Sequence, residues 1–218
     1  MAQFKPTLDD RTESISYWIQ EHVREVSIIA VVAIVLVGGF FGYRRMSAAT
    51  ERNAEQAFFA AQQLRQTADA AQAEAELSKV TTQFRGTAGG TQAAMVVAQL
   101  RYDAGKYVEG LQALEQLKDG GVDDEFEASV EALIAAGYEG QGKYAEAAAA
   151  YLRAASEARF AADKASYQAD AARVLGAEGK VAEAVKLWQA IADDPSSPLA
   201  DEARVRLGEL TVEPAGRS

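Results

Sequence analysis

The residues that could do chemistry are few, and their spacing fits no catalytic pattern. The chain has one histidine, His22, and no cysteine, which argues against a Ser-His-Asp triad, thiol chemistry, disulfides and His- or Cys-based metal sites. The stretch GTAGGT, residues 86–91, lacks the Lys-Ser/Thr ending of a phosphate-binding loop. The acidic stretch GGVDDEFE, residues 120–127, lacks EF-hand spacing and is typical of a helix start. We therefore predict no enzymatic activity, no metal and no cofactor.

The composition is that of a helical, acidic chain. The 218 residues are rich in Ala, Glu, Gln and Leu and contain only 4 prolines. The formal net charge is -10 at pH 7, which argues against non-specific attraction to nucleic acid. Residues 1–45 hold five Lys or Arg and five Asp or Glu, so residues 46–218 carry the whole net charge. An acidic domain of this kind is repelled by an anionic membrane surface.

One segment, VSIIAVVAIVLVGGFFGY at residues 26–43, is uncharged throughout. As a helix it would be ~27 Å long, close to the ~30 Å of a hydrocarbon layer. A buried core helix is one alternative, although few soluble helices are apolar on every face over this length. A cleaved signal peptide is another, with Ser47 and Ala49 as small residues, but Arg44 and Arg45 intervene. We predict an uncleaved transmembrane helix.

Residues 1–25 read as an N-terminal tail and an amphipathic lead-in to this span. Asp10 and Glu13 resemble a capping box. An apolar stripe follows at helical spacing, formed by Ile15, Trp18, Ile19, Val23 and Val26. We expect one helix over residues 11–45 that begins at the membrane interface and runs through the bilayer.

Charge alone does not orient the predicted span. Three basic residues precede it and three follow it: Lys5, Arg11 and Arg24, then Arg44, Arg45 and Arg52. The positive-inside count is a tie, and the adjacent Arg44 and Arg45 slightly favour a cytoplasmic domain. Gly38 and Gly42 form a small-xxx-small pair that would let two spans pack as a homodimer.

After a helical connector at residues 46–90, residues 91–210 contain one phrase three times. AGKYVEGLQALEQL, QGKYAEAAAAYLRA and EGKVAEAVKLWQAI place Gly at 105, 142 and 179, always 37 residues apart. Each copy predicts a helix, a Gly turn and a second helix. Thr91 is the expected N-cap of the first copy. In the middle copy we expect helices over residues 125–139, capped by Asp124, and over residues 144–157.

The same side-chain classes recur in the three second helices. A small, a large and a small or aliphatic residue share one face: Gly110, Leu114 and Leu117; Ala147, Tyr151 and Ala154; Ala184, Trp188 and Ile191. The small residue lets two helices approach and the large one fills the space between them. A last helix over residues 199–210, capped by Ser197, would close the array, and residues 211–218 would form a disordered tail.

These residues resemble the tetratricopeptide repeat (TPR). The matches in the middle copy are Ala135, Tyr138, Gly142, Tyr144, Ala147 and Tyr151. The period of 37 exceeds the usual ~34, and the Trp near the start of the first helix is absent. The fold class implied is all-α: an N-terminal transmembrane helix followed by an α-solenoid of TPR-like helix pairs with a terminal capping helix.

The order of parts resembles a narrower family, the bacterial ancillary subunit of the SecYEG translocon. The resemblance lies in an acidic N-terminus, one span ending in GGFFGYRR at residues 38–45, and a repeat domain to the end. It implies a single-pass protein of the bacterial inner membrane with a periplasmic C-terminal domain. The partners it implies are the SecYEG-type translocon, periplasmic chaperones and exported clients.

An α-solenoid also offers a concave face, lined mainly by the first helix of each pair, that suits a peptide. Phasing on the turn glycines predicts seven outward positions for such a groove: Met95, Gln99, Tyr102, Ala132, Ala136, Glu139 and Arg173. The alternative is that these side chains are solvated or pack against a neighbouring repeat. Two other functions stay open, a membrane-tethered scaffold for another envelope assembly process and a cytoplasm-facing receptor for chaperones or clients.

Overall fold

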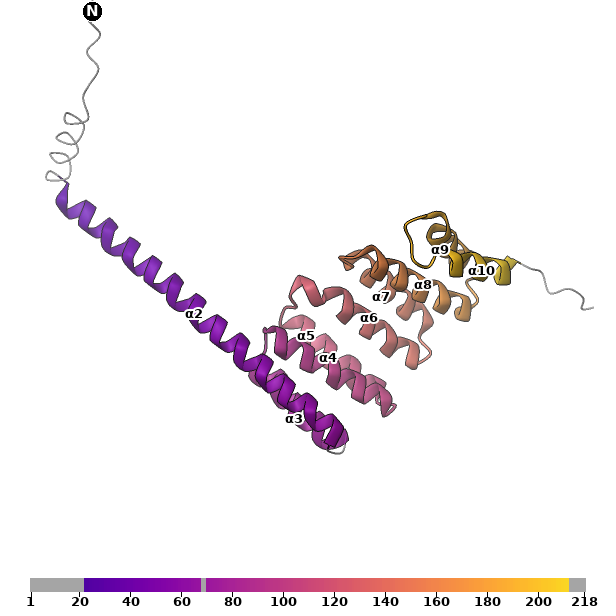
Figure 1. The fold of residues 1–218 in the computed structure, drawn as a ribbon, viewed down its shortest axis with the longest axis horizontal. Coiled ribbons are helices and arrows are strands. Elements are labelled where there is room, and N and C mark those ends of the chain that lie inside the picture. The colour runs from indigo at the N-terminus through magenta and orange to yellow at the C-terminus, as the bar shows by residue number, and fades with distance from the viewer. Residues whose placement is uncertain (1–21, 68–69, 212–218) are drawn as a thin grey trace, which may run out of the picture. The chain divides into compact units, whose positions relative to one another are not determined.

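The computed structural model describes residues 22–67 and 70–211, and the regular elements in these ranges are all α-helices (Figure 1). They are α2 Val23–Thr67, α3 Ala70–Gln83, α4 Ala88–Asp103, α5 Tyr107–Asp119, α6 Asp124–Gly140, α7 Tyr144–Glu157, α8 Ala161–Glu178, α9 Val181–Asp193 and α10 Ala200–Thr211. The prediction of an all-α repeat array is confirmed. The chain divides into two units, residues 1–49 and 50–218.

In the first unit the described residues form the beginning of α2. Their large apolar side chains are exposed, from 51% at Val32 to 74% at Met46. Counting only the described residues, we find no helix with an apolar stretch sufficient to cross a membrane. The predicted span over residues 26–43 is thus not seen; its positions 26, 29, 30, 33 and 43 lie outside the described side chains, as do residues 1–21 of the lead-in.

The predicted end of the first helix at residue 45 is wrong. α2 continues to Thr67 as one helix of 45 residues. Residues 46–67 are rich in Ala, Glu and Gln and contain neither Gly nor Pro, so nothing in the local sequence stops the helix. The predicted connector, residues 46–90, therefore holds the end of α2, all of α3 and the first turn of α4.

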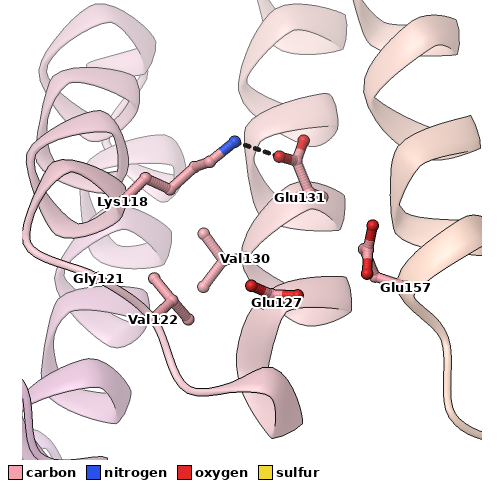
Figure 2. Close-up of a pocket in the computed structure, with 7 residues that line it drawn as sticks. All are labelled: Lys118, Gly121, Val122, Glu127, Val130, Glu131 and Glu157. Carbon is pink, nitrogen blue, oxygen red and sulfur yellow. Dashed lines mark hydrogen bonds and ion pairs between the residues drawn. The ribbon is translucent and has the colours of Figure 1, made fainter.

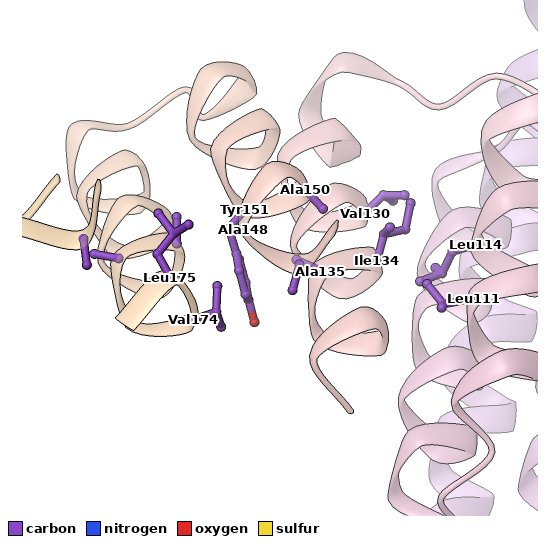
Figure 3. Packing of buried hydrophobic residues seen from close by; sticks show 14 of the residues in the cluster. Leu111, Leu114, Val130, Ile134, Ala135, Ala148, Ala150, Tyr151, Val174 and Leu175 are labelled. Atoms are coloured by element: carbon purple, nitrogen blue, oxygen red, sulfur yellow. The ribbon is translucent and has the colours of Figure 1, made fainter. Parts of the chain in front are cut away.

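In the second unit each helix from α4 to α10 packs against the one before it. α4 also contacts α6, so the first helices of these two pairs are neighbours. Phe58 and Ala61, near the end of α2, share a buried cluster with α3 and α4. A second and larger cluster extends from α4 to α10. Figure 3 shows part of it, from Leu111 and Leu114 through Val130 and Ile134 to Val174 and Leu175.

The recurring positions of the second helices are buried as predicted. In α7, Ala147 and Ala154 are fully buried and Tyr151 is 6% exposed. The equivalent residues of α5 and α9 are buried as well: Gly110, Leu114, Leu117, Ala184, Trp188 and Ile191. The small-large pattern therefore marks the contact face of each pair, and the structure confirms the packing that the sequence indicates.

The turns between paired helices have the predicted glycine geometry. Gly105, Gly142 and Gly179 have φ of +74°, +73° and +87°. In the middle turn, the Gly142 N–H donates to the Glu139 carbonyl at 2.8 Å and the Lys143 N–H to the Tyr138 carbonyl at 2.9 Å. These bonds satisfy carbonyls that the end of α6 would otherwise leave unpaired.

Two predicted helix starts are wrong by one to four residues. α6 is preceded by Asp123 as its N-cap residue, with no side-chain cap bond, whereas Asp124 is already helical. α4 is capped by Thr87, whose Oγ1 accepts from the Gly90 N–H at 3.1 Å, and Thr91 is buried inside the helix. α4 begins earlier than predicted because Gly89 and Gly90 are buried in the helix contacts and do not form a loop.

Gly89 shows why this helix begins early. A Cβ at Gly89 would lie 2.6 Å from the backbone carbon of Ala54, so α4 and α2 approach to a distance that only glycine permits. The Ala88 N–H donates to Glu51 Oε2 at 3.2 Å and adds a polar contact between the same two helices.

The predicted terminal helix is present as α10. It begins at Ala200, three residues after Ser197, whose Oγ accepts from the Leu199 N–H at 3.3 Å. Residues 212–218, most of the predicted tail, lie outside the described residues.

The turn geometry predicts opposite effects for two Gly→Ala substitutions. Gly142→Ala forces a Cβ into positive φ and should cost about 1–2 kcal/mol, a fall in Tm of roughly 2–8 °C. Gly208→Ala is the matched control, because its Cβ would meet no atom within 4 Å in the interior of α10 and should raise stability by about 0.5–1 kcal/mol. Thermal unfolding followed by circular dichroism checks both; equal effects would contradict the assigned turn.

Candidate protein-binding surfaces

Some of the predicted groove residues are exposed to solvent, and others pack against neighbouring helices. On α4, Met95 is half-buried against the core, and Gln99 is exposed and donates through Nε2 to Asp103 Oδ1 at 2.8 Å. On α6, Ala132 and Ala136 are half-buried. Their role in binding a peptide stays a prediction.

The outward placement of Tyr102 is wrong. Its side chain is 7% exposed, and its ring fills the space that two glycines leave open. A Cβ at Gly110 of α5 would lie 2.3 Å from Tyr102 Cε1, and one at Gly137 of α6 would lie 2.4 Å from its hydroxyl oxygen. Within the described residues this hydroxyl has no hydrogen-bond partner, and burial raises the pKa of Tyr102 above its usual range.

Glu139 and Arg173 are the two predicted residues that the structure brings together. Arg173 of α8 donates from both terminal nitrogens to the Glu139 carboxylate of α6, at 2.5 and 3.0 Å. Tyr151 of α7 donates its hydroxyl to Glu139 Oε2 at 3.2 Å, and Asp170 accepts from Arg173 at 3.2 Å. The Arg173 hydrogen bond lowers the pKa of Glu139, while burial raises the pKa of Tyr151. This cluster ties three helices together.

A buried carboxylate that the sequence analysis missed ties α5, α6 and α7. Glu131 of α6 is 6% exposed, and it pairs with Lys118 of α5 and, at 2.9 Å, with Arg153 of α7. It borders a cleft of about 390 Å³ (Figure 2). Glu127 and Glu157 line the same cleft, which we call the acidic cleft. The available signal was a charged residue on the predicted inner face of α6.

A second cleft, of about 450 Å³, lies among α3, α4 and α5. Arg85 and Arg101 line it together with Ser78, Thr81 and Thr82, and among the described residues no carboxylate lines it. An adjoining cleft of about 300 Å³ shares Arg101, Ala113 and Gln116 with it and is also lined by Lys106, Glu74 and Glu109. We call the two together the polar groove.

The described residues offer surfaces for binding but no assembled reaction centre. Among residues 22–67 and 70–211, no group of three or more His, Cys, Asp or Glu side chains is placed to hold a metal ion. A stack of helix pairs with open clefts defines the class of helical-repeat scaffolds that bind other proteins.

Within that class the chain belongs to the tetratricopeptide repeat-like domain family, whose model matches residues 16–212. The family is a protein-interaction scaffold and is typically non-catalytic. No curated protein sequence is significantly similar to the chain.

Solved structures show the same fold. The nearly identical TPR-like repeats assigned to a kinesin light chain of Podospora anserina match with a TM-score of 0.57 and 17% identity, covering 71% of this chain and 83% of that one. A single-residue variant of those repeats matches with a TM-score of 0.57, 18% identity and the same coverage. At this identity the likeness concerns the fold alone.

Tyr102 and Tyr151 allow the contribution of a buried tyrosine hydroxyl to stability to be compared without and with a hydrogen-bond partner. Tyr102→Phe removes an unpaired hydroxyl and should leave the free energy of unfolding unchanged or raise it by about 1 kcal/mol. Tyr151→Phe removes a donor to the Glu139 carboxylate and should lower it by about 1–2 kcal/mol. Urea unfolding measures both; an equal loss in the two variants would mean that the Tyr102 hydroxyl has a partner.

The Glu139–Arg173 pair predicts a pH-dependent contribution to stability. Because the folded-state pKa of Glu139 is lowered, its stabilisation is present above the unfolded pKa of about 4.3 and is lost as pH falls through the folded value. The stability difference between wild type and Arg173→Ala should therefore be largest near pH 7 and shrink below about pH 4. Lys186→Ala, an exposed control on α9, should show no such trend. A difference for Arg173→Ala that does not change with pH would contradict the pairing.

Proposed function

We propose that the protein is a membrane-anchored TPR-like interaction protein that acts as an ancillary subunit or co-chaperone at the protein-export translocon. In this role it passes exported proteins to periplasmic chaperones. The observation that carries the proposal is α2 itself. One helix holds both the uncharged segment at residues 26–43 and, at Phe58 and Ala61, part of the repeat core.

The exposed side chains of α2 support an apolar surrounding for its first part. Ile34, Val35 and Leu36 are each at least 66% exposed, on three successive positions and hence on different faces of the helix. Keeping apolar surface in water costs ~25 cal/mol per Å², whereas a hydrocarbon layer removes that cost. Arg44 lies 5.7 Å from the Phe40 ring centroid, where a cation can mark the end of a span.

The translocon and chaperone assignment is supported by the resemblance in the order of parts. The single-pass topology in the bacterial inner membrane, with a periplasmic C-terminal domain, has the same support. Arg44 and Arg45 favour a second candidate, a receptor whose repeat domain faces the cytoplasm. A scaffold for another envelope assembly process would share the first topology and differ only in its partners.

The topology is tested by protease protection of a tag placed after Ser218. In intact cells the tag should be cut only once the outer barrier is opened, and in inverted inner-membrane vesicles it should stay protected. Cleavage in the inverted vesicles would overturn the periplasmic placement and favour the cytoplasmic receptor. Crosslinking from Gln99 to translocon subunits then separates translocon association from another envelope process.

Anchoring is tested separately by alkaline extraction of membranes. A double substitution to Lys at Val35 and Leu36 should release the chain, because each Lys at mid-span costs ~2.5–3.5 kcal/mol. Phe59→Lys is the matched control on the same helix, outside residues 26–43, and its side chain is 59% exposed. Wild-type chain found in the extracted fraction would contradict the anchor.

A further inference from the structure

The acidic cleft and the 450 Å³ cleft of the polar groove lie at equivalent positions in successive repeats. An offset of 37 residues relates Gly90 to Glu127 and Ala94 to Glu131 on the first helices. It also relates Thr81 to Lys118 and Arg85 to Val122. The repeat thus provides one cleft twice, with carboxylates in the later copy and arginines without carboxylates in the earlier copy.

Arg85 is an exposed cation whose charge is available to a ligand. Within the described residues it makes no ion pair or hydrogen bond, and its Cδ lies 3.4 Å from the position of a Cβ on Gly120, over the end of α5. Arg101, by contrast, is paired with Glu74 at 2.8 Å, and both side chains are about three-quarters buried. Arg101 therefore shapes the middle of the groove, while Arg85 can accept a new carboxylate.

The polar side chains between these arginines fit a polypeptide backbone. Thr81 and Thr82 donate their hydroxyl hydrogens to the Leu77 and Ser78 carbonyls inside α3, so their oxygens are left to accept from N–H groups. Gln116 on α5 faces the same groove with an amide that both donates and accepts. Gly90, Ala94 and Ala113 also line the cleft, and residues of this size allow a main chain to approach.

The length of the groove suits a short extended segment. Its lining residues on α3 run from Glu74 to Thr82, which is ~12 Å of helix, and Arg85 lies beyond them. At ~3.3 Å per residue, an extended chain of about four or five residues would fill it. The groove uses a different face of α4 from Met95 and Gln99, because Ala94 and Arg101 lie about 100–160° around the helix from them.

We propose that the polar groove binds an extended acidic segment of a partner protein, with one of its carboxylates on Arg85. The choice of an acidic segment rests on charge at the Arg85 end of the groove: within the described residues Arg85 is unpaired and no carboxylate lines the 450 Å³ cleft. Glu74 and Glu109 line the adjoining cleft, where Glu74 is paired with Arg101. This inference depends on the fold being of a protein-binding class and does not depend on the proposed membrane topology. Its failure would leave the topology test untouched, and failure of the topology test would not affect it.

The test is fluorescence anisotropy with the full-length chain in mild detergent and a labelled hexaglutamate peptide. Hexaglutamate should bind, hexaglutamine should bind at least about tenfold more weakly, and raising the salt to ~1 M should weaken hexaglutamate binding. Arg85→Ala should weaken it about tenfold, and Arg85→Lys should retain part of it. Arg159→Ala is the matched control, because Arg159 is exposed and, within the part of the chain that the structure describes, has no ion pair; it should change nothing.

Three results would overturn the proposal. One is equal binding of hexaglutamate and hexaglutamine. Another is an equal loss in Arg85→Ala and Arg159→Ala, which would indicate non-specific attraction. The third is displacement of the peptide by inorganic phosphate at equal concentration, which would assign Arg85 to a free oxyanion. Ala113→Glu, which places a carboxylate in the groove without touching Arg85, should also block binding, and circular dichroism confirms that each variant is folded.

Discussion

The close approach of neighbouring helices is the constraint on which the rest of this structure depends. Ala and Gly occupy many of the buried contact positions, and in α7 the buried Tyr151 lies on the same face as the fully buried Ala147 and Ala154. Tyr102 of α4 fills the space left by Gly110 of α5 and Gly137 of α6. Each small residue buries little apolar area, so stability comes from the unbroken run of contacts from α2 to α10 and not from one dense centre.

The features that could be predicted from the sequence are those set by residues within a single repeat. The positive-φ glycines, the buried face of each second helix and the bounds of α7 follow from spacing within about 15 residues. The burial of Tyr102 could not be predicted in this way, because it depends on Gly137 in the next repeat. The same holds for the candidate site: Glu139 and Arg173 are on predicted helices, but their pairing and the two clefts arise from the stacking of helix pairs.

The repeat family concerns protein binding, whereas α2 concerns the proposed attachment to a membrane. The repeat domain places the chain in a protein-binding class, and two of its clefts occupy equivalent positions in successive repeats but differ in charge. α2 runs from Val23 to Thr67 and contributes residues to both units. Phe58 and Ala61, near the end of α2, belong to the core of the second unit, so removing this part of α2 would expose apolar surface of α3 and α4.

Glu131 also affects which repeat packs against which when the chain folds. Three repeats of the same side-chain pattern at a spacing of 37 residues invite a slip in which α6 docks where α4 belongs, or exchanges with another copy. In its own place the Glu131 carboxylate meets Lys118 and Arg153. One repeat earlier, the equivalent positions are Thr81 and Gln116, neither of which is charged. A slipped chain would bury a carboxylate with no counter-ion at those positions, so this one ion triad discriminates against the misassembly that the repetition makes available.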